Sequence, residues 1–172
     1  MHSSSAKSAD SDGSQDRGDI PATITWAVLT LIAHAALHFL VPPIMGIQRN
    51  LFVAQFQRMS PAQSASQVTI TVNSVLIAGL IYHLIFGILF IWLAFKIRAG
   101  RNWARIAGSV VLLLGGMGTF ISFSSPTPTP AVYKTLNIIS WFLALATLGL
   151  LWLPRESRAY FTTPKNPGKL TR

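Results

Sequence analysis

Three histidines in otherwise apolar stretches are the residues of this chain whose chemistry is most conspicuous. His34 and His38 are four residues apart, so they share one face of a helix, and His83 lies in a second apolar stretch. Two histidines from different helices can ligate a haem b iron, and all three could bind a transition-metal ion such as zinc or copper. The alternative is that the three rings are neutral and hydrogen-bonded to each other or to nearby hydroxyls.

The depth of the histidines follows from counting along two antiparallel helices. His34 lies 13 residues after Pro21, and His83 lies 13 residues before Lys96. At 1.5 Å per residue both side chains would be about 20 Å from the same end, with Gly79 opposite His38. The count therefore predicts His34 and His83 as the pair that could hold one haem, with room supplied by the glycine.

A basic cluster, "KIRAGRNWARIAG", separates two apolar stretches near the middle of the chain. Gly100 is suited to end one helix and Asn102 to cap the next. One interpretation is a turn whose cations orient the protein in a membrane. The other is a contact with anionic lipid head groups or with a partner protein. Its cations are Lys96, Arg98, Arg101 and Arg105.

The composition indicates a membrane protein that has few of the residue types used in catalysis. Of the 172 residues, 51% are hydrophobic and 11% are charged, against about 25% charged in soluble domains. The net charge of +9 arises next to apolar stretches, which favours lipid head groups over nucleic acid as the partner. There is no cysteine, and every acidic residue lies either in the first 19 residues or at Glu156. Thiol chemistry, paired-carboxylate catalysis and an intramembrane Ser-His-Asp triad therefore lack their residues.

The elements that must position these side chains are four apolar helices, so the expected fold is an all-α transmembrane four-helix bundle. The spans are predicted at about 20–42, 70–95, 103–123 and 132–153, and the first should end at Pro42-Pro43. Residues 1–19 are predicted to be a disordered tail and residues 154–172 a basic tail. The connector at 43–68 is expected to hold a short interfacial helix and then a helix start at Ser60, with Gln63 completing the cap.

The cations predict the orientation of the four spans. Eleven of them fall on the side that holds both termini and the 96–105 turn, and three fall on the other side. The positive-inside rule therefore places both termini in the cytoplasm. The first group is Lys7, Arg17, Lys96, Arg98, Arg101, Arg105, Arg155, Arg158, Lys165, Lys169 and Arg172, and the second is Arg49, Arg58 and Lys134.

Two asparagines stand in the apolar stretches. Asn73 lies near the outer end of the second predicted span, and Asn137 is expected at a similar depth in the fourth. Because an unpaired amide is costly in a poorly hydrated place, we expect the two side chains to form an interhelical hydrogen bond.

The sequence "AGRNWARI", followed by an apolar helix and a last span ending "LLWLPRESRAYF", resembles small uncharacterised four-span membrane proteins of actinobacterial type. The resemblance covers roughly residues 70–161 and implies a four-helix fold in the plasma membrane, without implying an activity. Three functions stay open. The first is a non-enzymatic accessory or interaction protein, which could bind itself or other membrane proteins. The second is a haem b or metal-binding protein, and the third is a small transporter or channel.

Overall fold

The computed structural model describes residues 20–124 and 130–162, with only the backbone described at 118–124. These residues form six helices and no strand: α1 (Ala22–Ile47), α2 (Arg49–Met59), α3 (Ala65–Arg98), α4 (Asn102–Ser124), α5 (Ala131–Trp152) and α6 (Arg155–Thr162). The all-helical class is thus confirmed. The predicted disordered tail at 1–19 lies outside the described residues.

Three of the helices, α1, α3 and α5, are long and apolar enough to cross a membrane. The outer face of α3 is apolar and exposed, as expected for a helix that contacts lipid and not water. Ile77, Ile81, Ile85 and Ile88 follow one another at helical spacing, and each is more than half exposed. An unbroken apolar stripe of this kind is typical of a lipid-facing surface.

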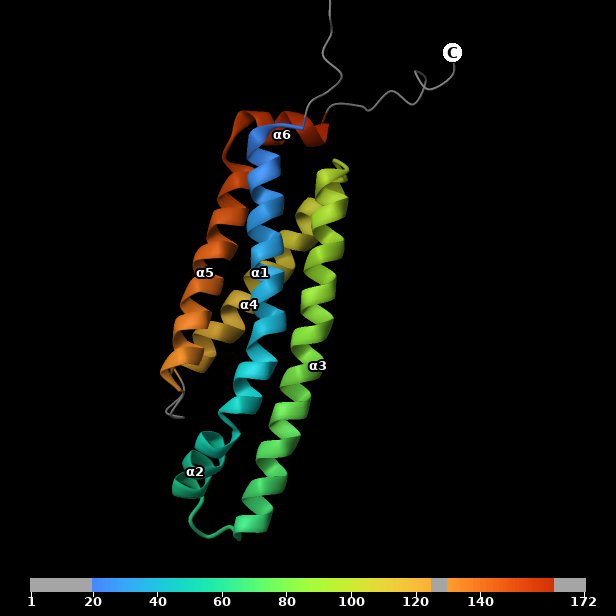
Figure 1. Cartoon of the computed structure of the whole chain (residues 1–172). Coiled ribbons are helices and arrows are strands. Elements are labelled where there is room, and N and C mark those ends of the chain that lie inside the picture. The colour runs from blue at the N-terminus through green and yellow to red at the C-terminus, as the bar shows by residue number, and fades with distance from the viewer. Residues whose placement is uncertain (1–19, 125–129, 163–172) are drawn as a thin grey trace, which may run out of the picture.

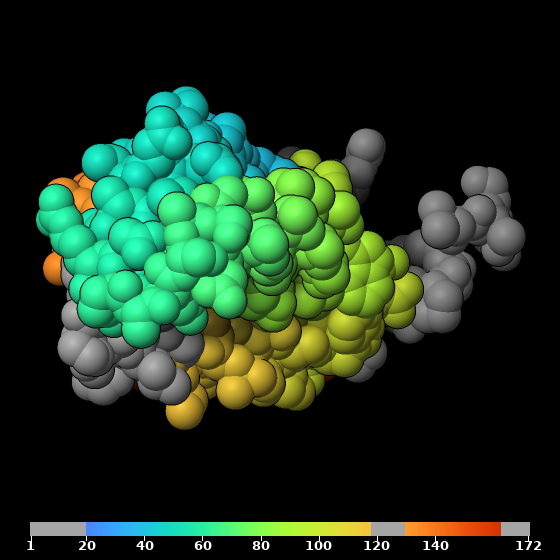
Figure 2. All heavy atoms as spheres, turned by 90° about the horizontal axis from the view of Figure 1, so that it is seen from below, coloured from blue at the N-terminus to red at the C-terminus, as the bar shows by residue number. Residues whose placement is uncertain are grey.

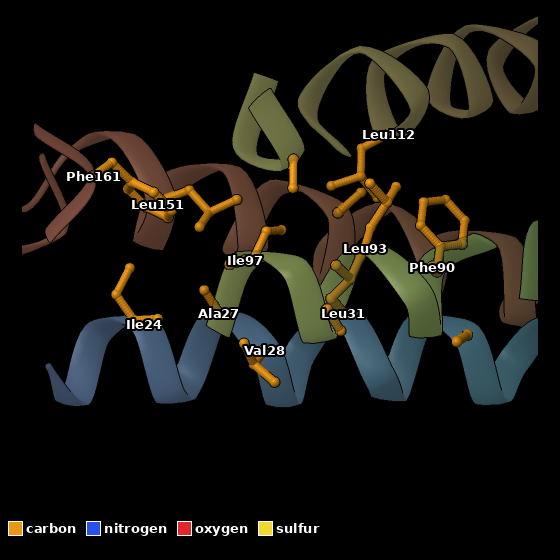
Figure 3. Packing of buried hydrophobic residues seen from close by; sticks show 14 residues of the cluster. Ile24, Ala27, Val28, Leu31, Phe90, Leu93, Ile97, Leu112, Leu151 and Phe161 are labelled. Carbon is orange, nitrogen blue, oxygen red and sulfur yellow. The ribbon is translucent and has the colours of Figure 1, made fainter. Parts of the chain in front are cut away.

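The four long helices surround a common core. α1 packs along both α3 and α5, and α4 crosses behind α1 and contacts the same two helices (Figure 1). Near the end where α1 begins, Leu31 of α1, Leu93 of α3 and Leu112 of α4 are almost completely buried against one another (Figure 3). At the opposite end α2 lies against the beginning of α3, and Figure 2 shows these two segments side by side at that end, with α4 visible beside α3.

Two predicted helix boundaries were wrong. α1 does not stop at Pro42-Pro43 but continues to Ile47, and such breaks in the hydrogen-bond ladder are tolerated in membrane helices that neighbours support. The capping box of α3 is formed by Ser64 and Gln67, four residues after the predicted one. Ser60 instead opens a turn, in which its carbonyl accepts from Gln63 N–H at 3.0 Å.

The first part of the predicted basic tail at 154–172 is instead the helix α6, which closes the end of the bundle, and residues 163–172 lie outside the described part of the chain. Ser157 is fully buried, and its hydroxyl lies 2.9 Å from Thr23 Oγ1 of α1. The Tyr160 hydroxyl donates to the carbonyl of Arg98 at the end of α3. Burial raises the pKa of Tyr160 above its ordinary value, which keeps this hydroxyl protonated as a donor. The aromatic ring of Phe161 completes the contact by entering the core.

Gly100 ends α3 as predicted. It has φ of 70°, its N–H donates to the Ile97 carbonyl at 2.8 Å, and Arg101 N–H donates to the Lys96 carbonyl at 3.1 Å. This pair of bonds is a Schellman motif, which needs a left-handed residue at its centre. Asn102, expected as the cap of the next helix, is instead its first residue, and the Arg101 carbonyl accepts the first hydrogen bonds.

Replacing Gly100 with alanine should therefore destabilise the protein by about 1–2 kcal/mol, the cost of a side chain in the left-handed conformation. Gly46 is the matched control, because it lies inside α1 and an added Cβ would meet no atom within 4 Å. Gly46→Ala should be neutral or stabilising by up to about 1 kcal/mol. Thermal unfolding in detergent would measure both, and equal effects of the two changes would contradict the assignment of Gly100.

Candidate functional site: a histidine-lined cavity

The three histidines lie together in a partly open cavity of about 310 Å³ that is lined by α1, α3, α4 and α5. His34 and His38 come from α1, and His83 comes from α3. Phe86, Phe90 and Trp141 supply aromatic walls. Helix periodicity explains the convergence, since the two histidines of α1 share a face and that face packs against α3.

His83 pairs with His38 and not with His34 as the sequence count predicted. The two Nδ1 atoms are 3.0 Å apart, and the ring centroids are 5.0 Å apart. The count failed by one turn because α3 continues past Lys96 to the Gly100 motif, so the two helices do not begin and end where it assumed. Gly79 is consequently not opposite His38, and the side chain nearest to it is Met45.

The His38–His83 contact restricts the protonation of the two rings. A hydrogen bond between two Nδ1 atoms of neutral rings needs one Nδ1 that carries a proton and one that accepts it. The two rings are therefore opposite tautomers, and of their Nε2 atoms one is an acceptor and the other a donor. The pair as a whole offers one donor and one acceptor to a further partner.

The opposite wall of the cavity comes from α5, of which only Asn137 was expected from the sequence to have a polar role, as the partner of Asn73. Tyr133, Asn137 and Ser140 line the cavity, and the Ser140 hydroxyl is 3.4 Å from His34 Nδ1. These polar residues are spaced by four and then three positions in an apolar helix. That spacing on one face was the available signal.

The predicted pairing of Asn73 with Asn137 is not found. The Asn73 side-chain oxygen accepts from Arg49 Nε at 2.9 Å, so α2 supplies its partner. Asn73 is ten residues before His83, which places it about 15 Å further along α3 than the cavity that Asn137 lines. α3 is longer than the predicted span, and this moves Asn73 away from the depth assigned to it.

A haem held between His38 and His83 would not fit, because two nitrogens in hydrogen-bond contact leave no space for a porphyrin between them. Ligation of a haem by His34 and His83, the pair expected from the sequence, stays a prediction. Across residues 20–124 and 130–162, no group of three histidine, cysteine or acidic side chains is arranged to hold a metal ion. Among the described residues that line the cavity, none carries a charged side chain.

No protein-family model matches this chain. Searches of curated proteins and of solved structures found no match either.

The basic cluster divides into two parts in the structure. Arg98 and Arg101 are exposed and Lys96 is half-buried, with its ammonium 5.8 Å from the centre of the Trp92 ring. Arg105 is different, because only 4% of it is exposed and its guanidinium lies 3.6 Å from the centre of the Trp152 ring. Its Nε and Nη2 atoms have no hydrogen-bond partner among the described residues.

Proposed function

We propose that this chain is a non-enzymatic, four-span protein of the plasma membrane that binds a small uncharged ligand in the histidine cavity. The observation that carries the proposal is a cavity between helices of a membrane protein, lined by apolar and polar side chains of which none among the described residues is charged. Sites of this kind are lined mostly by apolar and aromatic side chains, with a few polar groups that set the orientation of the ligand.

Polar groups with no protein partner support binding over a purely structural role. Within the described part of the chain, neither the Asn137 amide nor the Tyr133 hydroxyl makes a hydrogen bond, although both residues line the cavity. Both residues are half-buried, so their polar atoms are available to the donors and acceptors of a ligand in the cavity.

The four-span arrangement is supported by the length of α4 and by the charges at the helix ends. α4 has 23 residues, which is about the length that crosses a bilayer core. The α3–α4 turn and α6 lie at one end of the molecule, joined by the contact of Tyr160 with Arg98, and six of the nine Lys and Arg residues that the structure describes belong to this end. The positive-inside rule then puts both termini in the cytoplasm.

The exposed cations support a second role at the cytoplasmic end, as a contact for anionic lipid head groups or for an accessory partner. Arg98 and Arg101 are free to reach the head-group layer, where each cation contributes about 1 kcal/mol of attraction. Arg105 is the predicted member of this group that is buried, so it does not share the surface.

Filling the cavity should remove the ligand without unfolding the protein. Gly116 lines the cavity, and a Cβ there would lie 3.8 Å from Trp141, an ordinary contact. We expect organic extracts of the purified protein to contain a small molecule, at about one per chain, that is lost in Gly116→Leu. Mass spectrometry of the extracts measures this. Gly46→Leu, the matched control at a site with open space, should retain it.

Loss of the molecule in both variants, or its presence in both, would contradict binding in this cavity. If the extract contains no small molecule and the protein contains no metal, the histidines have only a structural role in helix packing. If the purified protein contains one metal ion per chain, and this metal is lost in His38→Ala and His83→Ala, then the ligand of the cavity is a metal ion and the proposal of an uncharged ligand is wrong.

The topology is tested with introduced cysteines, since the chain has none. Cysteines that replace Asn102 and Thr162, both exposed, should resist a membrane-impermeant thiol reagent in intact cells, whereas one at Ala62 should react. If α4 did not cross the membrane, positions 102 and 162 would be on opposite sides. Labelling of position 162 together with protection of position 102 would therefore exclude four spans.

A further inference from the structure

A second hollow, which is entirely apolar, adjoins the histidine cavity. Its volume is about 250 Å³, and it lies between α4 and α5. The two spaces share four lining residues and are therefore neighbours. The shared residues are Leu112, Gly116, Trp141 and Ala144.

The apolar hollow opens on the outer surface of the bundle. Leu113, Met117 and Leu145 line it, and each is more than half exposed. In a membrane this surface faces lipid, so an apolar chain can enter from the bilayer without passing through water. The histidine cavity, which has polar groups in its lining, and the apolar hollow together match a molecule with a polar head and an apolar tail.

The polar cavity restricts the chemistry of the head. With no charged residue in the described part of the lining, a phosphate or carboxylate head would be buried without a counter-charge, at a high cost. Phe86, Phe90 and Trp141 are suited to a planar ring, because aromatic side chains pack favourably against such rings. The His38–His83 pair has one donor and one acceptor left, which suits an oxygen that is a carbonyl in one form and a hydroxyl in another.

We propose that the ligand is a lipid quinone or its quinol, with the ring in the histidine cavity and the isoprenoid or alkyl tail in the apolar hollow. A cavity of about 150 Å³ is sufficient for benzene, so about 310 Å³ has room for a substituted quinone ring. The Asn137 amide and the Ser140 hydroxyl, on the opposite wall, can serve the second ring oxygen. This proposal rests on the proposed function, since it names the class of ligand for the same cavity.

The experiment is native mass spectrometry of the full-length protein in detergent with three added probes. The probes are a decyl-substituted benzoquinone, the same ring without the decyl chain, and decylbenzene, which has the ring and the tail but no oxygens. We expect one decyl-benzoquinone per chain, bound at least about tenfold more tightly than either of the other two, because each lacks half of the interactions.

Three variants separate the head site from the tail site. Gly116→Leu, at the junction, should abolish binding of the decyl-benzoquinone, and Gly46→Leu should not change it. His38→Leu should weaken the binding of this quinone by about fivefold to tenfold, which is the effect of one lost hydrogen bond, and leave the binding of decylbenzene unchanged. Leu148→Trp narrows the apolar hollow, so it should weaken the binding of the decyl-benzoquinone and leave the binding of the ring without a tail unchanged. Phe142→Trp, at an exposed position, is its control and should change neither.

Equal binding of decylbenzene and decyl-benzoquinone would overturn the quinone assignment, because the oxygens would then contribute nothing. Quinone binding that persists in Gly116→Leu would overturn the location. If no probe binds while the extract of the purified protein still yields a Gly116-dependent molecule, the quinone is wrong and the ligand-binding function stands. If neither result is obtained, both proposals fail.

Discussion

Phe90→Ala is expected to lower the free energy of unfolding by about 3–5 kcal/mol, the range for removing a buried aromatic side chain. Phe90 is 1% exposed and packs edge-on against His34, with ring centroids 4.7 Å apart. It lies between the core cluster and the histidine cavity, and it belongs to both. Alanine would enlarge the cavity and remove the contacts that hold α1 against α3.

Phe142→Ala is the control for this prediction. Phe142 is 70% exposed on α5, where lipid or detergent chains can fill the space that its ring leaves. Its replacement should change stability by less than about 0.5 kcal/mol, as for other surface positions. Reversible unfolding in mixed micelles would compare the two. A loss at Phe142 as large as that at Phe90 would show that the face described as lipid-facing is buried in an assembly.

Arg105→Met is expected to stabilise the protein by about 1–4 kcal/mol, which is the gain seen when buried ionic groups are replaced by well-packed apolar ones. The guanidinium is buried, two of its nitrogens have no partner among the described residues, and it lies in the first turn of α4, where the helix dipole disfavours a cation. The cation–π contacts with the rings of Trp152 and Phe161, at 3.6 and 5.1 Å, stabilise the buried guanidinium by only about 2 kcal/mol.

Arg101→Met, one turn earlier and exposed, is the matched control and should change stability by less than about 0.5 kcal/mol. Arg105→Lys should be worse than the wild type, because a compact ammonium is more strongly hydrated than a guanidinium and stacks less well on the rings. Thermal unfolding in detergent measures all three. If Arg105→Met is destabilising by 2 kcal/mol or more, on the order of a buried ion pair broken at one partner, then an acceptor for Arg105 exists outside the described residues.

The periodicity of single helices could be read from the sequence, and much of the fold followed from it. Apolar stretches of spanning length predicted α1, α3 and α5, and the Gly100 turn between α3 and α4 was expected from its residues. The shared face of His34 and His38 was equally predictable, because it depends only on 3.6 residues per turn. These features are local, and local backbone geometry is encoded in neighbouring residues.

Register and partner choice were decided by the tertiary structure. Counting from assumed helix ends paired His34 with His83 and Asn73 with Asn137, whereas packing paired His83 with His38 and Asn73 with Arg49. An error of a few residues at a helix end moves a side chain by 1.5 Å per residue and rotates it by about 100° per residue, so it changes which groups meet. The sequence by itself determined that polar groups had to be buried in an apolar bundle. Only the packing of α5 and α4 against α1 and α3 decided that they line one cavity beside an apolar hollow, because that depends on how whole helices fit together.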